Sequence, residues 1–333
     1  MEYRGVLILT RSEVAELMDL SDYMHAVENA FLLPASGGIP GPGVLDIPAE
    51  RGMFHVKGSS MLAGGRIYVA VKVNGNFPEN KSRFELPTIQ GAILLCDGIH
   101  GYPLAVLDSV EITTCRTAAA TAIAAKRLAR SDSRTATMCG CGVQGKIQLL
   151  ALTNVLPLTR AFAFDRDESV AAAFSREMTQ KSGIPVIAVR RPEEGTRQSD
   201  VIVTCTTSRR FFLKRDHVPR GAFVAAVGAD SHDKQEIDPA LMASSKVVTD
   251  ITSQCERIGD LHHAIEAKVM TRGDVYAELH DIVSGARPGR VADEEIVVFD
   301  STGTALQDVA AAAVAYQRAV ERGIGKFVNL IGS

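Results

Sequence analysis

The sequence lacks an excess of positive charge. Its 333 residues include 36 lysines and arginines against 39 aspartates and glutamates, which gives a formal net charge of −3. Binding to nucleic acid or to an anionic membrane depends on a positive field. We therefore expect neither as a partner.

Long hydrophobic runs are absent too. The apolar run near the start, "VLIL", is too short for the core of a signal peptide, and no stretch approaches the roughly 20 apolar residues of a membrane-spanning helix. These absences predict a cytoplasmic protein.

The cysteines do not form the regular pattern of a disulfide framework. Most lie in apolar runs, which is typical of buried small side chains in a reducing compartment. Two of them form a C-x-C pair with no second pair of ligands, so the sequence predicts no metal site. The six are Cys96, Cys115, Cys139, Cys141, Cys205 and Cys255.

What is present indicates two domains, the usual outcome for a chain of this length. From Thr135 onward, short apolar runs alternate with helical segments, and such near-continuous apolar strands favour a parallel sheet covered on both faces. The predicted strands are "TATMCG", "RAFAFD", "IPVIAV", "SDVIVTCT", "AFVAAVG", "SKVVTD" and "EIVVFDS".

The first third of the chain has a different pattern. In "RIYVAVKVNG", Val69, Val71 and Val73 alternate with the residues around Lys72, and "GMFHVKGSS" alternates in the same way. "AILLCDGIHGYPLAVLDS" predicts a hairpin. These features indicate a mixed α+β domain of mainly antiparallel strands.

Two long helices are predicted at the domain crossings, over 110–130 and 304–323. The second follows the last strand, so we expect the chain to return there to the first domain. The predicted organisation is an α/β protein with a mixed α+β domain, 1–116 with 311–333, and a parallel-sheet domain, 117–310.

A glycine motif predicts where a dinucleotide binds. Gly140, Gly142 and Gly145 fit G-x-G-x-x-G between a predicted strand and a predicted helix, which is the context this motif requires. The loop would contact the pyrophosphate through backbone N–H groups at the helix start. The intervening loop residues are Cys141, Val143 and Gln144.

Asp165 favours NAD as the cofactor. It follows the next strand, 165 − 145 = 20 residues after the last glycine, near the spacing of about 20 expected for an acid that binds the ribose hydroxyls. Arg166 could instead bind the 2′-phosphate of NADP. We therefore expect NAD, with NADP as the alternative.

Several longer segments resemble the ornithine cyclodeaminase and mu-crystallin family. They are "VKVNGNFPEN", "LPTIQGAILLCD", "GYPLAVLDSVEITTCRTAAATA", "GCGVQG", "VGADSHDKQEID" and "FDSTGTALQDVAAA". They run in the family order over nearly the whole chain. The resemblance implies a homodimer in which 1–116 with 311–333 is the substrate-binding and dimerisation domain and 117–310 is the Rossmann dinucleotide-binding domain. It also implies a small amino or imino acid as substrate.

The resemblance also implies roles for residues of the active site. Lys72 and Asp230 are the expected catalytic residues, and Arg116 is expected to bind the substrate carboxylate bidentately. Thr88 and Thr117 match positions at the substrate. From the pattern alone, a lysine on one face of an alternating strand is more often solvent-facing. Further cofactor contacts are expected from Thr204, Thr206, Gly228 and Ser301.

Two positions depart from the family pattern. Many members have an arginine where this chain has Val44, and ornithine cyclodeaminases have a glutamate where it has Lys57. A lysine there would repel the second amino group of ornithine and could instead bind the substrate carboxylate. His55 lies on the same face, either beside the substrate or at the surface.

These departures favour an NAD(P)-dependent reductase of a cyclic or linear imino acid that also works as an amino-acid dehydrogenase. The alternatives are an ornithine cyclodeaminase, which recycles its own NAD, and a ligand-binding protein similar to mu-crystallin.

Overall fold

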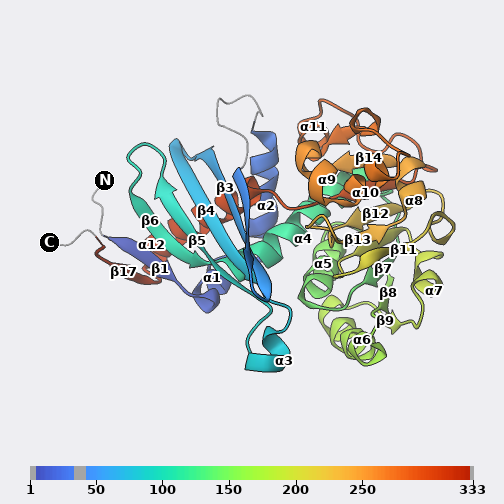
Figure 1. The fold of residues 1–333 in the computed structure, drawn as a ribbon, viewed down its shortest axis with the longest axis horizontal. Helices are drawn as coiled ribbons and strands as arrows, with labels where there is room; N and C mark the ends of the chain where they lie inside the picture. Colours follow the sequence, from blue (N-terminus) through green and yellow to red (C-terminus); the bar gives the residue numbers. More distant parts are fainter. Residues whose placement is uncertain (1–4, 34–42, 331–333) are drawn as a thin grey trace. The chain divides into compact units, whose positions relative to one another are not determined.

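The computed structural model describes residues 5–33 and 43–330. The chain divides into two compact units, Met1–Arg116 with Thr304–Ser333 and Thr117–Gly303 (Figure 1). The predicted return to the first unit at residue 311 lies inside a continuous helix that begins at Ala305. The structure places the return at Thr304, directly before this helix, so the whole helix belongs to the first unit. Among the described helices, none has the length and hydropathy of a membrane-spanning segment.

The first unit contains a seven-stranded sheet in the order β17-β1-β6-β5-β4-β3-β2. Neighbouring strands are antiparallel except β1 and β6, which are parallel. The strands are β1 (Val6–Leu9), β2 (Gly43–Ala49), β3 (Gly52–Ala63), β4 (Arg66–Asn76), β5 (Ile89–Asp97), β6 (Pro103–Asp108) and β17 (Lys326–Val328).

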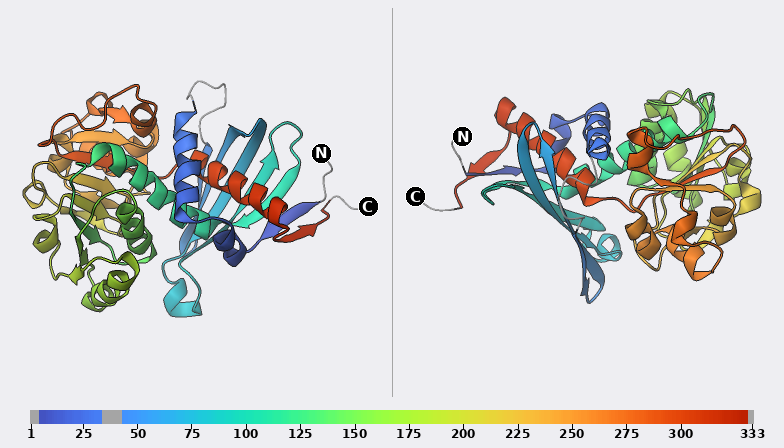
Figure 2. Two further views of the ribbon diagram at one scale, coloured as in Figure 1. Left: turned by 180° about the vertical axis from the view of Figure 1, so that it is seen from behind. Right: turned by 90° about the horizontal axis from the view of Figure 1, so that it is seen from above.

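Two long helices cover one face of this sheet (Figure 2). Helix α12 packs against β3, β4 and α2, and its alanine-rich sequence allows a close approach to the strands. The helices of this unit are α1 (Arg11–Leu17), α2 (Leu20–Leu32), α3 (Asn80–Phe84), the start of α4 (Ser109–Leu128), and α12 (Ala305–Arg322).

The face of β4 that carries Lys72 is the buried one. Lys72 is 3% exposed, whereas Val71 and Val73 on the opposite face are 36% and 40% exposed within this chain. The predicted alternation is correct, and Lys72 lies on the buried face, unlike most lysines on one face of an alternating strand. Helix α12 covers the lysine side of the sheet, and the valine side remains open.

The second unit has an eight-stranded sheet in the order β15-β14-β16-β12-β10-β7-β8-β9, and all its neighbouring strands are parallel. A separate pair is formed by β11 (Arg209–Leu213) and β13 (Gln235–Ile237). The eight strands are β7 (Thr135–Cys139), β8 (Arg160–Phe164), β9 (Val186–Ala188), β10 (Val201–Thr204), β12 (Phe223–Ala226), β14 (Lys246–Thr249), β15 (Ala277–Glu278) and β16 (Val297–Asp300).

Helices lie on both faces of this sheet (Figures 1 and 2). The segment β9-β8-β7-β10-β12 follows the 3-2-1-4-5 order of a dinucleotide-binding fold, which confirms the predicted fold class. The helices are α5 (Val143–Thr153), α6 (Glu168–Ser182), α7 (Pro192–Thr196), α8 (Pro239–Ala243), α9 (Thr252–Ile258), α10 (Asp260–Glu266) and α11 (Leu279–Val283), with short 3-10 turns at Arg215–His217 and Arg272–Asp274.

Candidate functional site

The three glycines of the motif have three different structural environments. A Cβ added to Gly140, whose φ is +106°, would lie 2.8 Å from the Cys205 carbonyl oxygen, and one added to Gly145 would lie 2.1 Å from the Gly140 oxygen. A Cβ on Gly142 would meet no protein atom within 4 Å. The first and third glycines are therefore needed by the fold, whereas the second leaves space beside the loop.

That space adjoins the N-terminus of α5. Gly142 is the N-cap residue, and no side chain of the described residues caps the helix. The first N–H groups of the helix are thus left for an anionic ligand. Cys141 is buried and Val143 is 67% exposed at this loop, and Gln144 is half-buried. Open space and uncapped N–H groups at a helix start are the features that a pyrophosphate-binding loop requires.

Asp165 directly follows β8 and turns toward the glycine loop. Its carboxylate accepts hydrogen bonds from the backbone N–H of Cys141, at 3.0 Å, and of Asp167, at 3.1 Å. These contacts fix the carboxylate beside the loop, where it can accept from ribose hydroxyls. Arg166, the alternative determinant, is exposed.

Thr206 and Gly228, which follow β10 and β12, are joined by a buried carboxylate. Glu236 Oε1 accepts from both the backbone N–H and the hydroxyl of Thr206 at 2.6 Å, and its Oε2 accepts from the Gly228 N–H at 3.0 Å. Burial raises the pKa of Glu236 although these hydrogen bonds oppose the effect. Thr204, the last residue of β10, is fully buried. Glu236 therefore sets the positions of two loops at the carboxyl ends of the strands, where such folds bind ligands.

The same arrangement continues behind Glu236. The N–H of Glu236 donates to Asp260 at 2.9 Å, and the N–H of Leu261 donates to Asp300 at 2.9 Å. Burial raises the pKa of Asp300, and the neighbouring Asp250 adds to the shift. Asp260 thus holds the backbone at Glu236, and Asp300 holds the backbone at Leu261.

Ser301 is held by a further buried carboxylate. Its hydroxyl donates to Asp250 at 3.1 Å, and the Gly303 N–H donates to the same side chain at 2.6 Å. Asp250 thereby orders the loop after β16.

Asp230 lies in the loop between β12 and β13, and its side chain is 50% exposed. It is paired with Lys234, four residues along the same loop. This exposure contrasts with the burial of Glu236 and leaves the Asp230 carboxylate accessible.

The predicted residues of the first unit form a buried charge cluster. Asp308 Oδ2 lies 2.6 Å from Lys72 Nζ, and Asp308 Oδ1 accepts from Arg116 Nε at 3.0 Å. Arg116 Nη1 also donates to Gln307 at 3.0 Å, and Lys72 Nζ donates to Thr113 at 3.4 Å. Lys72, Arg116 and Asp308 are 3%, 4% and 1% exposed. The guanidinium plane and the lysine are thus fixed by their partners.

The cluster changes the acidity of Lys72. Burial lowers the pKa of Lys72 to about 7, the Asp308 carboxylate opposes this shift, and Arg116 and Lys57 add to it. For Asp308, burial acts to raise the pKa, but the nearby cations Lys72, Arg116 and Lys57 outweigh it and the pKa is lowered. Asp308 therefore stays ionised, and Lys72 can exchange a proton near neutral pH.

Lys57 lies directly opposite Lys72 in the β3–β4 pair and is itself buried. Like charges placed opposite each other destabilise a sheet, so the pair is not explained by strand stability. Val44 is in turn the β2 partner of Lys57, which places an apolar side chain beside the cluster. His55, one pair further along this face, is bound to Asp46 at 2.7 Å.

Thr88 and Thr117, the two threonines predicted to lie at the substrate, have different environments. Thr117 is buried on α4, one residue after Arg116. Thr88 is half-buried just before β5, and its carbonyl oxygen accepts from the Phe77 N–H at 2.8 Å.

Asp308 and Glu236 are the main residues that the sequence analysis missed. Asp308 is the only acid in the alanine-rich segment "ALQDVAAAAVAYQ", and a lone charge on the buried face of a helix was the available signal. The signal for Glu236 is weaker: it is an acid inside the short strand β13, between Gln235 and Ile237.

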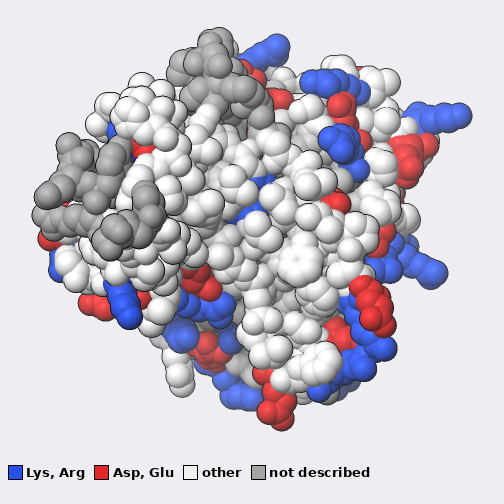
Figure 3. Space-filling model, turned by 60° about the vertical axis from the view of Figure 1, so that its left-hand side comes forward, with Lys and Arg blue, Asp and Glu red and all other residues white. Residues whose placement is uncertain are grey.

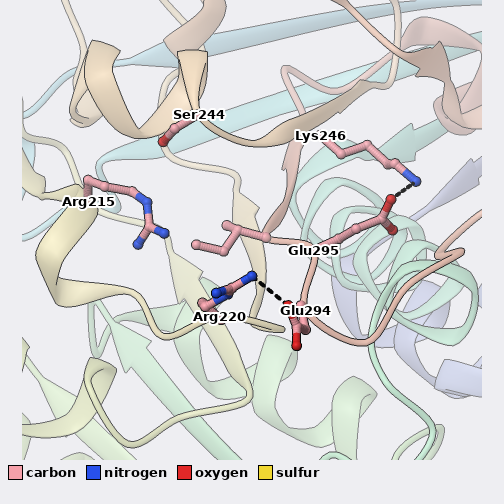
Figure 4. Close-up of a pocket in the computed structure, with 7 residues that line it drawn as sticks. Arg215, Arg220, Ser244, Lys246, Glu294 and Glu295 are labelled. Atoms are coloured by element: carbon pink, nitrogen blue, oxygen red, sulfur yellow. Dashed lines mark hydrogen bonds and ion pairs between the residues drawn. The ribbon is translucent and has the colours of Figure 1, made fainter.

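A hollow elsewhere in the second unit does not fit the predicted site. Its volume is about 450 Å³, and its cations face acids across it, with Lys246 on Glu295 and Arg220 on Glu294 (Figure 4). Lys246 begins β14 and Ile296 precedes β16, so the hollow lies at the amino ends of the strands. The glycine loop follows the carboxyl end of β7. Open parallel sheets bind ligands at the carboxyl ends of their strands.

Comparison with known proteins gives a consistent result. The model of the ornithine cyclodeaminase/mu-crystallin family matches residues 5–323. An archaeal alanine dehydrogenase, a dimer with bound NAD, is 36% identical, with 98% of this chain and 100% of that chain covered and a TM-score of 0.93. The Thermococcus litoralis Δ1-pyrroline-2-carboxylate reductase with NADH and L-proline is 33% identical over 97% and 100%, with a TM-score of 0.92. The Paracoccus denitrificans iminosuccinate reductase with NAD+ is 30% identical over 98% and 100%, with a TM-score of 0.89.

Proposed function

Since this chain belongs to the ornithine cyclodeaminase/mu-crystallin family, we propose that it is an NAD(P)-dependent oxidoreductase acting on the C–N bond of a small amino or imino acid. The observation that carries the proposal is the buried cluster of Lys72, Arg116 and Asp308. A buried cluster of charges adds little stability to a fold, because burying charges is costly. A function in substrate binding accounts for it.

The cofactor we propose is NAD. When bound, it exchanges a hydride with the substrate carbon next to nitrogen. The open space at Gly142 and the uncapped start of α5 fit its pyrophosphate, and Asp165 suits an unphosphorylated ribose. The three relatives described above contain NAD, NADH or NAD+.

The cluster suits an α-carboxylate. Arg116 and Lys57 both act on Lys72 as neighbouring positive charges, so an anionic ligand would be attracted to this part of the first unit. In this proposal Arg116 binds the substrate carboxylate, since a guanidinium matches it bidentately. Asp308 acts as the positioning residue that holds Arg116 and Lys72.

Lys72 and Asp230 handle protons in the proposed reaction. Lys72, with a pKa of about 7, can donate a proton toward the imine nitrogen during reduction and accept one during oxidation. The accessible carboxylate of Asp230 is suited to a proton exchange with nitrogen or water.

Lys57 favours an imino-acid reductase or amino-acid dehydrogenase over an ornithine cyclodeaminase. It lies beside Lys72 in the strand register. A second amino group on the substrate would meet this charge, whereas a neutral side chain or ring would not.

We also propose that the protein forms a homodimer in the cytoplasm through the open face of the first sheet. The strand register places a group of exposed apolar side chains on the face opposite to Lys72. Figure 3 shows a broad uncharged area on this side of the molecule, with charged side chains toward its margins. An exposed apolar face of this extent is typical of an interface. The side chains are Leu45, Ile47, Phe54, Val71, Val73 and Leu94.

The test is an absorbance assay at the nicotinamide band. Purified protein would be mixed with NADH or NADPH and a panel of cyclic and linear imino acids, and with NAD+ and amino acids in the reverse direction. We expect substrate-dependent oxidation of NADH with at least one imino acid. Ammonia release from ornithine without net cofactor change would indicate a cyclodeaminase instead.

A matched pair of variants makes the assay specific. Lys72→Met should lower turnover by about 10²–10⁴-fold, the usual contribution of a proton-transfer group, and keep NADH binding. Lys126→Met changes an exposed lysine on α4 and should leave turnover unchanged. NADH binding without turnover of any substrate in the wild-type protein would indicate a ligand-binding protein similar to mu-crystallin.

A further inference from the structure

Helix α10 carries two adjacent histidines and a glutamate that none of the proposed steps uses. One possible ligand atom from each of His262, His263 and Glu266 lies within 4.8 Å of the other two. All three residues are in the second unit. They are not part of the glycine loop, and the sequence analysis assigned them no role.

The tautomers of both histidines follow from their backbone partners. His262 Nδ1 lies 3.2 Å from the Glu256 carbonyl oxygen, and His263 Nε2 lies 2.8 Å from the Lys234 carbonyl oxygen. A carbonyl oxygen only accepts, so each of these ring nitrogens is the one that carries hydrogen. In a neutral ring, the lone pair is then on His262 Nε2 and on His263 Nδ1.

Both lone pairs face the same carboxylate oxygen. Glu266 Oε2 lies 3.5 Å from His262 Nε2 and 3.9 Å from His263 Nδ1. Two neutral imidazole lone pairs and a carboxylate repel one another unless a cation lies between them. The cation is either a proton on a ring or a metal ion.

The spacing of these atoms suits a small transition-metal ion. Zinc binds imidazole nitrogen and carboxylate oxygen at about 2.0–2.2 Å, so neighbouring ligands in a tetrahedral site lie roughly 3.3–3.5 Å apart. The observed separations are 3.5 and 3.9 Å to Glu266 Oε2, and the two ring nitrogens lie within 4.8 Å of each other, so the three side chains would move closer together around the ion. Metal-binding histidines characteristically donate their other N–H to a carbonyl or carboxylate, as both do here.

The geometry points to a binding site for a divalent transition-metal ion, of which Zn²⁺ is the prime candidate, formed by His262, His263 and Glu266 with the remaining positions open to water. Through the carbonyl partners of the two rings, the ion would connect α10 to α9 and to Lys234 in the Asp230 loop. The expected consequence is stabilisation of this part of the second unit.

The experiment uses the full chain after removal of metal by a chelator that is then dialysed away. Zn²⁺ alone would be titrated in competition with a chromophoric indicator, and Co²⁺ would report the coordination through its visible absorption. We expect one equivalent of Zn²⁺ to bind with a Kd in the micromolar range or below. The melting temperature should rise with Zn²⁺ concentration, because the ion binds the folded state.

Single variants identify the ligands. His262→Gln, His263→Gln and Glu266→Gln should each weaken Zn²⁺ binding by at least about tenfold, since even loss of an outer-shell partner costs about 10–100-fold in affinity. His280→Gln is the matched control: this part-exposed histidine of the second unit pairs with Glu278 and Asp281, and its loss should leave affinity unchanged.

Two results would overturn the assignment. One is the absence of saturable Zn²⁺ binding below millimolar concentration. The other is unchanged binding in the three single variants, which would place the ion on other groups such as the cysteines.

Discussion

Asp308 Oδ2 lies 2.6 Å from Lys72 Nζ, and this contact joins a helix near the end of the chain to a strand in its first third. The same carboxylate accepts from Arg116 Nε at 3.0 Å. One acid thus fixes the two cations to which we assign proton transfer and carboxylate binding.

The lowered pKa of Lys72 predicts opposite pH dependence for the two directions of reaction. With a pKa of about 7, Lys72 loses its proton as the pH rises through neutrality. Imine reduction, which needs the protonated form, should slow above about pH 7, and amino-acid oxidation should slow below it. Steady-state rates over this range measure both breaks. Profiles without a break near neutrality in either direction would contradict the role.

Asp308→Asn should shift that break and destabilise the fold. The Asp308 carboxylate raises the pKa of Lys72, so its removal should move the break to lower pH. Loss of one partner of a buried ion pair costs about 3–5 kcal/mol, which denaturant unfolding would measure. Asp132→Asn, in which a 78% exposed side chain is changed, is the control and should alter neither quantity. An unmoved break in Asp308→Asn would remove the coupling.

Two glycine substitutions should separate cofactor binding from folding. Gly142→Ala adds a Cβ that meets no protein atom within 4 Å, at a φ of −78°, so it should fold normally and bind NADH more weakly. Gly145→Ala places a Cβ 2.1 Å from the Gly140 oxygen and should lower the melting temperature. The readouts are NADH fluorescence titration and thermal unfolding. Wild-type NADH affinity in Gly142→Ala would argue against a pyrophosphate at this loop.

Glu236→Gln should weaken cofactor binding while the fold is retained. The amide can accept from Thr206, but its NH2 group then faces the Gly228 N–H, which loses its acceptor. An unsatisfied buried N–H costs about 1–3 kcal/mol. If the loops of the free protein move to relieve this cost and the loops of the NADH-bound protein cannot, the affinity for NADH falls roughly 5–150-fold. We expect a higher Kd for NADH and an unfolding midpoint that falls less than in Gly145→Ala. Glu294→Gln, at a 72% exposed side chain, should have no effect on Kd.

Lys57→Glu should improve the acceptance of ornithine. The change replaces a cation opposite Lys72 with an anion that attracts a second amino group, and the gain should exceed about tenfold in kcat/KM relative to a cyclic imino acid. Lys57→Gln separates loss of repulsion from new attraction. If the ratio of the two substrates does not change in Lys57→Glu, Lys57 is not the determinant that disfavours a cyclodeaminase.

Much of the second unit could be predicted from the sequence because its signals are local. The helical segment between the predicted strands "RAFAFD" and "IPVIAV" is α6, Glu168–Ser182, closed by Gly183 in the left-handed conformation. The strand expected in "RAFAFD" is β8, Arg160–Phe164. In each case the residues that specify the element lie within it or directly beside it.

The environment of Lys72 could not be predicted in this way. Alternation along β4 separates two faces, but it does not say which face a helix covers. The covering helix, α12, comes more than 200 residues later and brings Asp308 with it. The buried state of the lysine, and with it the lowered pKa, depends on that packing.

The sequence by itself thus determined the strands, the glycine loop and the family, since these depend on short-range patterns and on motifs in a fixed order. The tertiary structure alone decided which charges are buried together: Asp308 with Lys72 and Arg116, Glu236 with Thr206 and Gly228. The physical reason is that desolvation and ion pairing act between groups that are close in space, and their separation along the chain places no limit on that.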